Sequence, residues 1–168
     1  MTRITRLRPD DVERYRAIRL EALTSHPEAF VAAPDVFASR SDAELRRTLE
    51  ELAVFGAETE VGELAGIVAF LRNEGLKERH RGWMIQVYVR AGHRNNGIGA
   101  KLVEHLIEHA RHHVLQVHLG VWSENLPAIR LYERFGFRTY GTEPRYLFVD
   151  GRFIDEHLMV RFLDGPGS

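Results

Sequence analysis

The sequence contains no cysteine among its 168 residues. That absence excludes a disulfide framework, a cysteine metal site and a thiol nucleophile. An excess of charge of one sign is also lacking, because 23 lysine and arginine residues stand against 24 aspartate and glutamate residues and leave a formal net charge of −1 at pH 7. Without an overall basic field, the chain is not expected to bind nucleic acid.

Long apolar runs are missing as well. No run approaches the ~20 residues that a helix needs to cross a bilayer, and the N-terminal residues lack the apolar core of a signal peptide. We therefore expect a cytoplasmic protein with no membrane partner. Hydrophobic residues make up 44% of the chain and charged residues 28%, as in ordinary globular domains. The length suggests one domain over residues 1–163, followed by a flexible tail at residues 164–168.

Hydrophobic periodicity and turn residues predict a mixed α/β domain. Strands are expected at residues 2–8, 54–58, 64–71, 83–89, 114–122, 137–149 and 152–162. Helices are expected after Pro9, after Ser41, from the glycine-rich segment described below to about His113, and from about Pro127 to Phe135. Residues 25–40 and 72–82 are expected to be irregular, and Asp150-Gly151 is expected to form a type I′ turn.

The most informative segment is Arg94-Asn95-Asn96-Gly97-Ile98-Gly99-Ala100, which lies between a predicted strand and a predicted helix. Backbone N–H groups in such a turn point into one small space, and the positive end of the helix dipole lies behind them. Gly97 and Gly99 let a phosphate approach the backbone without a Cβ atom in the way. The spacing fits neither a Walker loop nor the dinucleotide-binding fingerprint, so a different pyrophosphate-bearing cofactor is expected.

A second motif begins at Asn125, continues through Tyr132 and ends at Gly136-Phe137. Pro127 suits the first turn of a short helix, and Gly136 suits its left-handed C-cap. Taken together, Arg-x-x-Gly-x-Gly and this Asn–Tyr–Gly-Phe pattern resemble the two signatures of the GNAT superfamily of N-acetyltransferases. They occur in the family's order and are separated by one predicted strand.

The resemblance implies an α/β (α+β) fold with a central mixed, mostly antiparallel sheet of about seven strands and about four flanking helices. In that fold the fourth and fifth strands splay apart, and the pantetheine arm of acetyl-CoA lies in the gap. Acetyl-CoA would therefore be the co-substrate of this chain.

The resemblance also assigns cofactor contacts. Backbone groups of Val87, Tyr88 and Val89 would hold the pantetheine amides and the thioester carbonyl. The backbone N–H groups of Asn95, Asn96, Gly97, Ile98, Gly99 and Ala100 would bind the pyrophosphate, Arg94 would add charge, and Asn125 would bond the pantetheine arm. Lys101, Arg130 and Arg134 either face the adenine-side phosphates or, as we favour, form solvated helix faces.

By the same resemblance, Tyr132 is the catalytic residue that protonates the departing CoA thiolate. A thiol titrates near ~8.5 and a tyrosine near ~10, so complete transfer from an unperturbed tyrosine is uphill by roughly 2 kcal/mol. We expect Tyr132 to act as a general acid, with hydrogen-bond donation to the thiolate as a close alternative. The structural alternative is an ordinary core aromatic residue.

The general base is not identified by the sequence. An alkylammonium titrates near ~10, so it must lose a proton before attack at neutral pH. Some family members place a glutamate five residues before the asparagine, where this chain has Gly120. The remaining candidates are Glu124, Glu21, Glu28, a water ordered by Gln86 and Tyr88, or an amine that arrives neutral.

A zinc-hydrolase pattern competes with this interpretation. His105 and His109 complete a His-x-x-Glu-His sequence, in which two histidines four residues apart can hold zinc. The stretch, however, continues the helix that the glycine-rich segment begins. A half-exposed, histidine-rich helix is therefore the preferred interpretation, and no metal is expected.

The acceptor pocket of this fold is usually built from the first two helices, their connection and the last hairpin. Here those segments contain His26, Phe30, Phe37, Tyr146 and Phe148, without the acidic cluster that a polycation would need. We expect direct transfer of acetyl from acetyl-CoA, in a ternary complex, to a primary amine of a small molecule or a peptide N-terminus. The alternative is a non-catalytic acyl-CoA-binding sensor. The acyl-chain preference stays open, and a homodimer is suggested by fold analogy alone.

Overall fold

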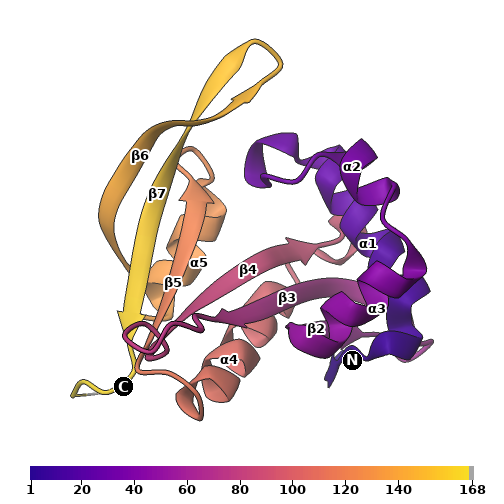
Figure 1. The fold of residues 1–168 in the computed structure, drawn as a ribbon, viewed down its shortest axis with the longest axis horizontal. Coiled ribbons are helices and arrows are strands. Elements are labelled where there is room, and N and C mark those ends of the chain that lie inside the picture. The colour runs from indigo at the N-terminus through magenta and orange to yellow at the C-terminus, as the bar shows by residue number, and fades with distance from the viewer. Residues whose placement is uncertain (167–168) are drawn as a thin grey trace. The chain divides into compact units, whose positions relative to one another are not determined.

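The computed structural model describes residues 1–166 and contains a seven-stranded sheet in the order β1-β2-β3-β4-β5-β7-β6 (Figure 1). The strands are β1 (Arg3–Arg6), β2 (Ala53–Glu58), β3 (Leu64–Arg72), β4 (Arg81–Val89), β5 (Gln116–Trp122), β6 (Arg138–Val149) and β7 (Arg152–Phe162). The α-helices are α1 (Val12–Ser25), α2 (Pro34–Ala38), α3 (Asp42–Glu51), α4 (Ile98–Arg111) and α5 (Leu126–Arg134).

The contacts group the chain into two compact units. Unit 1 consists of residues 1–69 and 86–102, and unit 2 consists of residues 70–85 and 103–168. The glycine-rich segment therefore belongs to unit 1, whereas Asn125 and Tyr132 belong to unit 2. The expectation of one domain over residues 1–163 stays a prediction. Of the expected tail, residues 167 and 168 lie outside the described residues.

In unit 1, β1 pairs antiparallel with β2, and Ile4 lies opposite Ala57. The helix α1 buries one apolar stripe, which consists of Val12, Tyr15, Ile18, Ala22 and Leu23. A capping box begins α3, since the Ser41 hydroxyl accepts from the Glu44 N–H at 3.2 Å and the Glu44 carboxylate accepts from the Ser41 N–H at 2.7 Å. At Gly66 a Cβ atom would lie 2.8 Å from the Tyr88 carbonyl oxygen, so glycine permits this close approach of β3 to β4.

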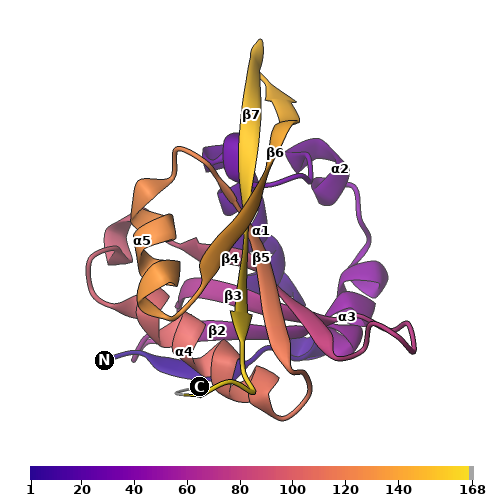
Figure 2. The same cartoon turned by 90° about the vertical axis from the view of Figure 1, so that its left-hand side faces the viewer.

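In unit 2, β5 pairs antiparallel with β7 along its whole length, and β7 pairs antiparallel with β6. Figures 1 and 2 show β6 and β7 as a long hairpin that extends past the end of β5. Asp150 and Gly151 form its turn with φ values of 50° and 75°, as a type I′ turn requires. The parallel pairing of β4 with β5 joins residues 81–83 to residues 116–118.

The fold class predicted from the sequence is confirmed, since the sheet is mixed and mostly antiparallel and helices flank it. Splaying of β4 from β5 beyond their short pairing stays a prediction. Several boundaries differ from expectation. The strand β1 covers only Arg3–Arg6 of the expected residues 2–8, and β5 begins at Gln116 instead of residue 114. Residues 25–40 contain a short 3₁₀ turn, Pro27–Ala29, and the helix α2, each beginning with a proline at a first-turn position. The strand β4 begins at Arg81, two residues before the expected start at Trp83.

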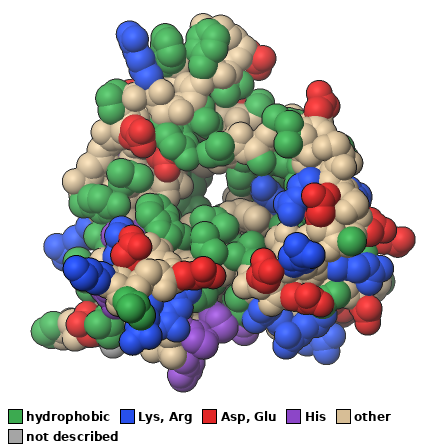
Figure 3. All heavy atoms as spheres, viewed as in Figure 1, with side chains coloured by type: hydrophobic (Ala, Val, Ile, Leu, Met, Phe, Trp, Pro, Cys, Tyr) green, Lys and Arg blue, Asp and Glu red, His purple; other side chains and the backbone are tan. Residues whose placement is uncertain are grey.

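The described residues include no membrane-spanning helix, and the face drawn in Figure 3 carries no surface of a single charge sign. Among residues 1–166, no helix is long and apolar enough to cross a bilayer. On the face drawn in Figure 3, acidic and basic side chains are interspersed, in keeping with the near-neutral net charge.

Candidate active site

The glycine-rich loop of unit 1 has the backbone geometry of an anion nest. Asn95 and Gly97 adopt left-handed conformations, with φ values of 64° and 75°. The Lys101 N–H donates to the Gly97 carbonyl at 3.1 Å, so the N–H groups just before it lie at the N-terminus of α4, where no i−4 partner exists. A Cβ atom on Gly97 would meet no atom within 4 Å. An anion therefore finds both donors and open space at this loop.

The Arg94 side chain anchors the base of this loop. Its Nε donates to the Val89 carbonyl at 3.1 Å, and its Nη2 lies 2.8 Å from His26 Nε2. The His26 ring in turn lies 5.8 Å from the Tyr88 ring. Arg94 thus ties the loop to the end of β4 and to the residue that ends α1. The predicted contact between Arg94 and phosphate stays a prediction.

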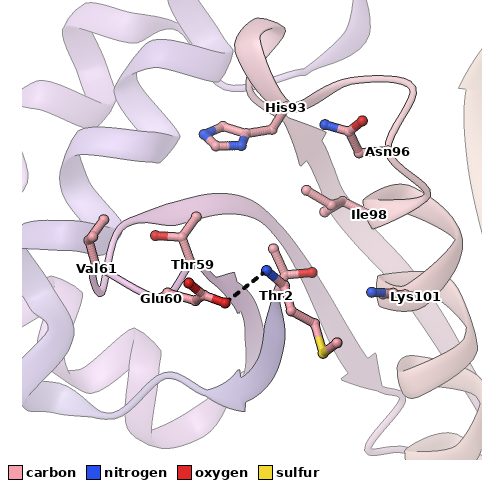
Figure 4. A pocket seen from close by; sticks show the side chains of 9 residues that line it. Thr2, Thr59, Glu60, Val61, His93, Asn96, Ile98 and Lys101 are labelled. Atoms are coloured by element: carbon pink, nitrogen blue, oxygen red, sulfur yellow. Dashed lines mark hydrogen bonds and ion pairs between the residues drawn. The ribbon is translucent and has the colours of Figure 1, made fainter.

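A hollow of about 410 Å³ lies beside the loop within unit 1 (Figure 4). One wall comes from the loop and α4, and the other comes from the N-terminus and the turn after β2. Within the second wall, the N-terminal amine of Met1 lies 3.3 Å from Glu60 Oε1. The lining residues are Met1, Thr2, Thr59, Glu60, Val61, His93, Asn96, Ile98 and Lys101.

The strand β4 carries a left-handed residue just before the predicted thioester-binding stretch. Gln86 has a φ of 59°, and its side-chain oxygen accepts a 3.0 Å hydrogen bond from the hydroxyl of buried Tyr15. Such a conformation at a non-glycine residue costs about 1–3 kcal/mol and persists only where the surroundings fix it. It changes the direction of the backbone at the residue that precedes Val87, Tyr88 and Val89.

Two of the sequence-predicted bases in unit 1 are already engaged. The Tyr88 hydroxyl donates to Glu21 Oε2 at 2.8 Å, and the same oxygen lies 3.3 Å from Arg90 Nε. Burial first, and Glu21 second, raise the pKa of Tyr88. Glu28 lies 3.6 Å from the Nδ1 atom of His26. Glu21 in particular is fixed by two partners, which makes it a poor candidate for the general base.

Two of the aromatic residues predicted for the acceptor pocket, Phe30 and Phe37, lie in unit 1 around Arg19, a residue that the sequence analysis missed. Arg19 is 5% exposed, and its guanidinium lies 5.3 Å from the Phe30 ring and 5.8 Å from the Phe37 ring. Its Nε and Nη1 atoms are buried without a hydrogen-bond partner. Burial lowers its pKa. The position four residues after Tyr15, on the buried stripe of α1, was the signal that could have found it.

In unit 2, α5 positions the second motif. Asn125 is its N-cap, and the side-chain oxygen accepts from the Ala128 N–H at 3.4 Å, which leaves the amide NH₂ as the donor for a ligand. Tyr132 is 6% exposed, and its ring lies 6.1 Å from that of Phe137. Burial raises the pKa of the Tyr132 phenol well above its usual range. Gly136 follows the helix with a φ of 85°, as predicted for its C-cap.

Beside Gly120 the structure places a carboxylate that the sequence analysis did not consider. Gly120 is exposed on β5, and a Cβ atom there would overlap Glu156 Oε1 from β7. Glu156 lies opposite Trp122 on one side and Glu143 on the other. Burial, and then the charge of Glu143, raise the pKa of Glu156 to about 7, while hydrogen bonding with Tyr146 acts in the opposite direction. Tyr146, which was predicted for the acceptor pocket, thus contacts this carboxylate. Phe148, predicted for the same pocket, packs against Phe153 with ring centroids 5.0 Å apart.

The histidine-rich part of α4 shows aromatic packing. The His109 ring lies 5.4 Å from the Phe70 ring and 4.6 Å from the His113 ring. Within residues 1–166, no group of three or more His, Cys, Asp or Glu side chains is placed to hold a metal ion. The zinc alternative therefore has no ligand set in the described part of the chain.

Comparison with known proteins bears on the two motifs together. The model of the acetyltransferase (GNAT) family matches residues 15–137. The L-amino acid N-acetyltransferase AaaT of Escherichia coli is 31% identical over 70 residues, which span 40% of this chain and 43% of that protein. The L-methionine sulfoximine/L-methionine sulfone acetyltransferase of Salmonella typhimurium is 36% identical over 81 residues, or 46% of each chain. The matched regions thus span less than half the length of these curated relatives.

Solved structures share the fold over nearly the whole chain. An acetyltransferase of the GNAT family from Streptococcus pneumoniae superposes with a TM-score of 0.86 at 24% identity, covering 97% of this chain and 100% of that chain. The putative acetyltransferase yncA from Salmonella typhimurium, solved with its cofactor acetyl-CoA, has a TM-score of 0.81 at 24% identity, with 100% and 97% covered. Because the family match covers most of the sequence and includes both the glycine-rich loop and the Asn125–Tyr132 motif, the chain belongs to the acetyltransferase (GNAT) family.

Proposed function

We propose that this protein transfers the acetyl group of acetyl-CoA to a primary amine by direct attack in a ternary complex. The observation that carries the proposal is the loop before α4, where two left-handed residues precede the helix N-terminus and the space beside Gly97 is open. A pyrophosphate is the ligand that such a nest suits. Membership of the family supports acetyl-CoA as the molecule that carries it.

The proposed roles follow the two motifs. The N–H groups of residues 95–100 bind the pyrophosphate. The backbone of Val87, Tyr88 and Val89 binds the pantetheine amides and the thioester carbonyl, and the Asn125 amide bonds the same arm. A backbone N–H directed at that carbonyl stabilises the oxyanion of the tetrahedral intermediate, which is worth roughly 3 kcal/mol per donor. The Val89 carbonyl already accepts from Arg94, so its contribution would come from its N–H.

For Tyr132 we propose hydrogen-bond donation to the CoA thiolate, with complete proton transfer as the alternative. The raised pKa keeps the phenol protonated across the neutral range, so the donor is always present. The same raised pKa makes complete transfer to a thiolate costlier than the roughly 2 kcal/mol of an unperturbed tyrosine. A strong hydrogen bond stabilises the leaving group without that cost.

The acceptor is proposed as a primary amine on a small molecule or a peptide N-terminus, in the cytoplasm. Relatives with similar sequences are named for L-amino acids, for spermine and spermidine, and for N-alpha-acetylation. The aromatic set around Arg19 includes no carboxylate, which argues against a polycation as the acceptor. A homodimer remains a proposal that rests on fold analogy.

The test of the function is an acetyl-transfer assay that follows release of the CoA thiol. Acetyl-CoA would be mixed with the protein and with L-amino acids, spermine or a peptide bearing a free N-terminus. Thiol release that depends on one amine, with its N-acetyl product seen by mass spectrometry, is the expected result. Tight acetyl-CoA binding without turnover on any amine would instead favour the non-catalytic acyl-CoA-binding sensor.

A further inference from the structure

Amine acetylation needs a proton acceptor that neither motif supplies. An alkylammonium with a pKa near ~10.4 is almost wholly protonated at neutral pH, and only the free amine attacks a thioester. An effective general base titrates close to the working pH and can be partly reached by substrate. The inference below rests on the proposed function, because it names the group that takes this proton.

One carboxylate in unit 2 occupies space that a neighbouring residue leaves free. Gly120 has no side chain on the exposed face of β5, and Glu156 Oε1 reaches into the volume that a Cβ atom would fill there. The register explains this reach. Gly120 lies opposite Leu158 and Trp122 lies opposite Glu156, so Glu156 is the diagonal neighbour of Gly120 on the same face of the antiparallel pair.

The groups that face Glu156 come from two strands. From β6, Glu143 lies directly opposite and contributes like charge, and Tyr146 contributes a hydroxyl. From β5, Trp122 lies opposite and Gly120 contributes only backbone. The side chain is half-buried, so it combines desolvation with access from solvent. Burial and the like charge of Glu143 both favour the protonated form of Glu156 near neutral pH.

We propose that Glu156 is the general base of acetyl transfer. The carboxylate takes a proton from the acceptor ammonium, directly or through one water, and the freed nitrogen lone pair attacks the thioester carbonyl. The C–N bond forms, the C–S bond breaks, and the nitrogen loses its second proton, which reaches the CoA sulfur through solvent. The products are the N-acetyl amine and the CoA thiol, and hydrogen bonding stabilises the sulfur as it leaves. Glu156 then returns its proton to solvent. Gly120 keeps the carboxylate reachable, which makes it a positioning residue.

The pH dependence of kcat/KM tests the assignment. Wild-type kcat/KM should rise with pH through an acid limb near pH 7, because Glu156 acts only when deprotonated. Glu156→Gln should lower kcat at pH 7.5 by about 10²-fold or more and remove this limb. Glu143→Gln should shift the limb to lower pH, since it removes the like charge, while high activity persists at alkaline pH. Glu133→Gln, which changes an exposed carboxylate on α5, should alter neither quantity.

A second experiment tests the contact between Glu156 and the open position at Gly120. Gly120→Ala should displace the flexible end of Glu156 and lower kcat by ~10²-fold, without a large change in folding stability. The double variant Gly120→Glu with Glu156→Ala carries a carboxylate on β5 in place of the one on β7. Recovery of activity by this pair, relative to Glu156→Ala alone, is the expected result, because it restores a base and not merely a packing contact.

Calorimetric titration of acetyl-CoA distinguishes an incorrect assignment of Glu156 from an incorrect proposed function. Glu156→Gln should bind acetyl-CoA as the wild type does. If Glu156→Gln keeps the wild-type rate and the wild-type acid limb, the assignment of Glu156 is wrong while acetyl transfer stands. If the wild type turns over none of the amines named above yet binds acetyl-CoA, acetyl transfer itself is wrong and the base assignment fails with it.

Discussion

At the scale of single residues, burial decides what Tyr132 and Arg19 can do. Tyr132 is almost wholly enclosed and its pKa is raised by that burial, so its hydroxyl is a permanent donor at neutral pH. Arg19 is equally enclosed, but two of its nitrogen atoms have no partner. A buried cation without a carboxylate partner costs several kcal/mol in desolvation, and stacking on aromatic rings returns about 2 kcal/mol. The first residue suits catalysis, and the second lowers stability.

Tyr132→Phe keeps the ring that packs against Phe137 and removes the hydroxyl alone. We expect kcat to fall by about 10²-fold, with the Kd of acetyl-CoA unchanged, because the donor acts on the thiolate that forms during reaction. Steady-state kinetics with calorimetry measure both quantities. Tyr140→Phe, which removes the hydroxyl that contacts His118, is the control and should leave kcat as it is. An unchanged kcat in Tyr132→Phe would exclude its catalytic role.

Arg19→Met should raise thermal stability. The variant keeps an unbranched side chain near Phe30 and Phe37 and removes the unpaired charge, for a gain of about 1 kcal/mol. That gain corresponds to an increase in Tm of roughly 2–4 °C for a chain of this size. Arg16→Met on the same helix removes an arginine that is paired with Asp42 at 2.8 Å and should not raise Tm. A lower Tm in Arg19→Met would mean that ring stacking outweighs the desolvation of the guanidinium.

At the scale of elements, β4 and the loop that follows it form the proposed cofactor-binding side of unit 1. The left-handed Gln86 precedes the stretch 87–89, and the left-handed Asn95 and Gly97 precede α4. The conformation of Gln86 is fixed by the Tyr15 hydroxyl from α1, so a helix far away in sequence supports the strand. Backbone that is held in a costly conformation by a neighbouring element is typical of a functional site.

Tyr15→Phe removes the hydrogen bond to Gln86 while keeping the buried ring. We expect a loss of about 1 kcal/mol in the free energy of unfolding, together with a higher KM for acetyl-CoA, because residues 87–89 are no longer held in one arrangement. Ser41→Ala removes the α3 capping box and should cost about the same stability. Since α3 lies outside the proposed site, KM should stay constant in Ser41→Ala. Equal KM values in the two variants would show that the Gln86 conformation is unrelated to cofactor binding.

Local chemistry explains which elements and site residues could be predicted from the sequence. The Gly97 loop, the α3 capping box and the Asp150-Gly151 turn depend on neighbouring residues, and each was found. The contact of Glu156 with Gly120 depends on the register of β5 against β7, which no local pattern specifies. Arg19 was missed because a charged residue on a helix is expected to face solvent. The short helix α2 cannot be predicted from its proline alone, because proline is common both in irregular segments and in the first turn of a helix.

At the scale of the whole molecule, the two motifs belong to different compact units. The anion nest is built from unit 1, whereas Tyr132, Asn125 and Glu156 are carried by unit 2. The near-neutral net charge and the mixed surface charges give no field that would select substrates at long range. Selectivity for the acceptor is therefore expected to come from contacts at the site. The pH dependence of the free energy of unfolding is likewise a property of the whole molecule.

Glu156 should make the folded protein less stable as pH rises. Its pKa is raised in the folded state to about 7, so the folded chain holds a proton that the unfolded chain, with an ordinary glutamate near ~4.3, releases. The stabilising contribution is complete below the unfolded pKa and is lost as pH rises through about 7. Glu156→Gln should therefore have a higher Tm than wild type at pH 8, with the difference shrinking toward pH 4.5. A constant difference would contradict the raised pKa.

The measurement that bears most directly on the account is calorimetric titration of acetyl-CoA, with CoA and NAD as comparison ligands. Gly97→Glu places a carboxylate in the nest, and Gly151→Glu is its matched control, since both glycines have a φ of 75° and open space around them. We predict micromolar binding of acetyl-CoA to the wild type and to Gly151→Glu, weak binding to Gly97→Glu, and no comparable affinity for NAD. Absence of acetyl-CoA binding to the wild type, or equal affinity in Gly97→Glu, would show that the loop is only the start of a helix.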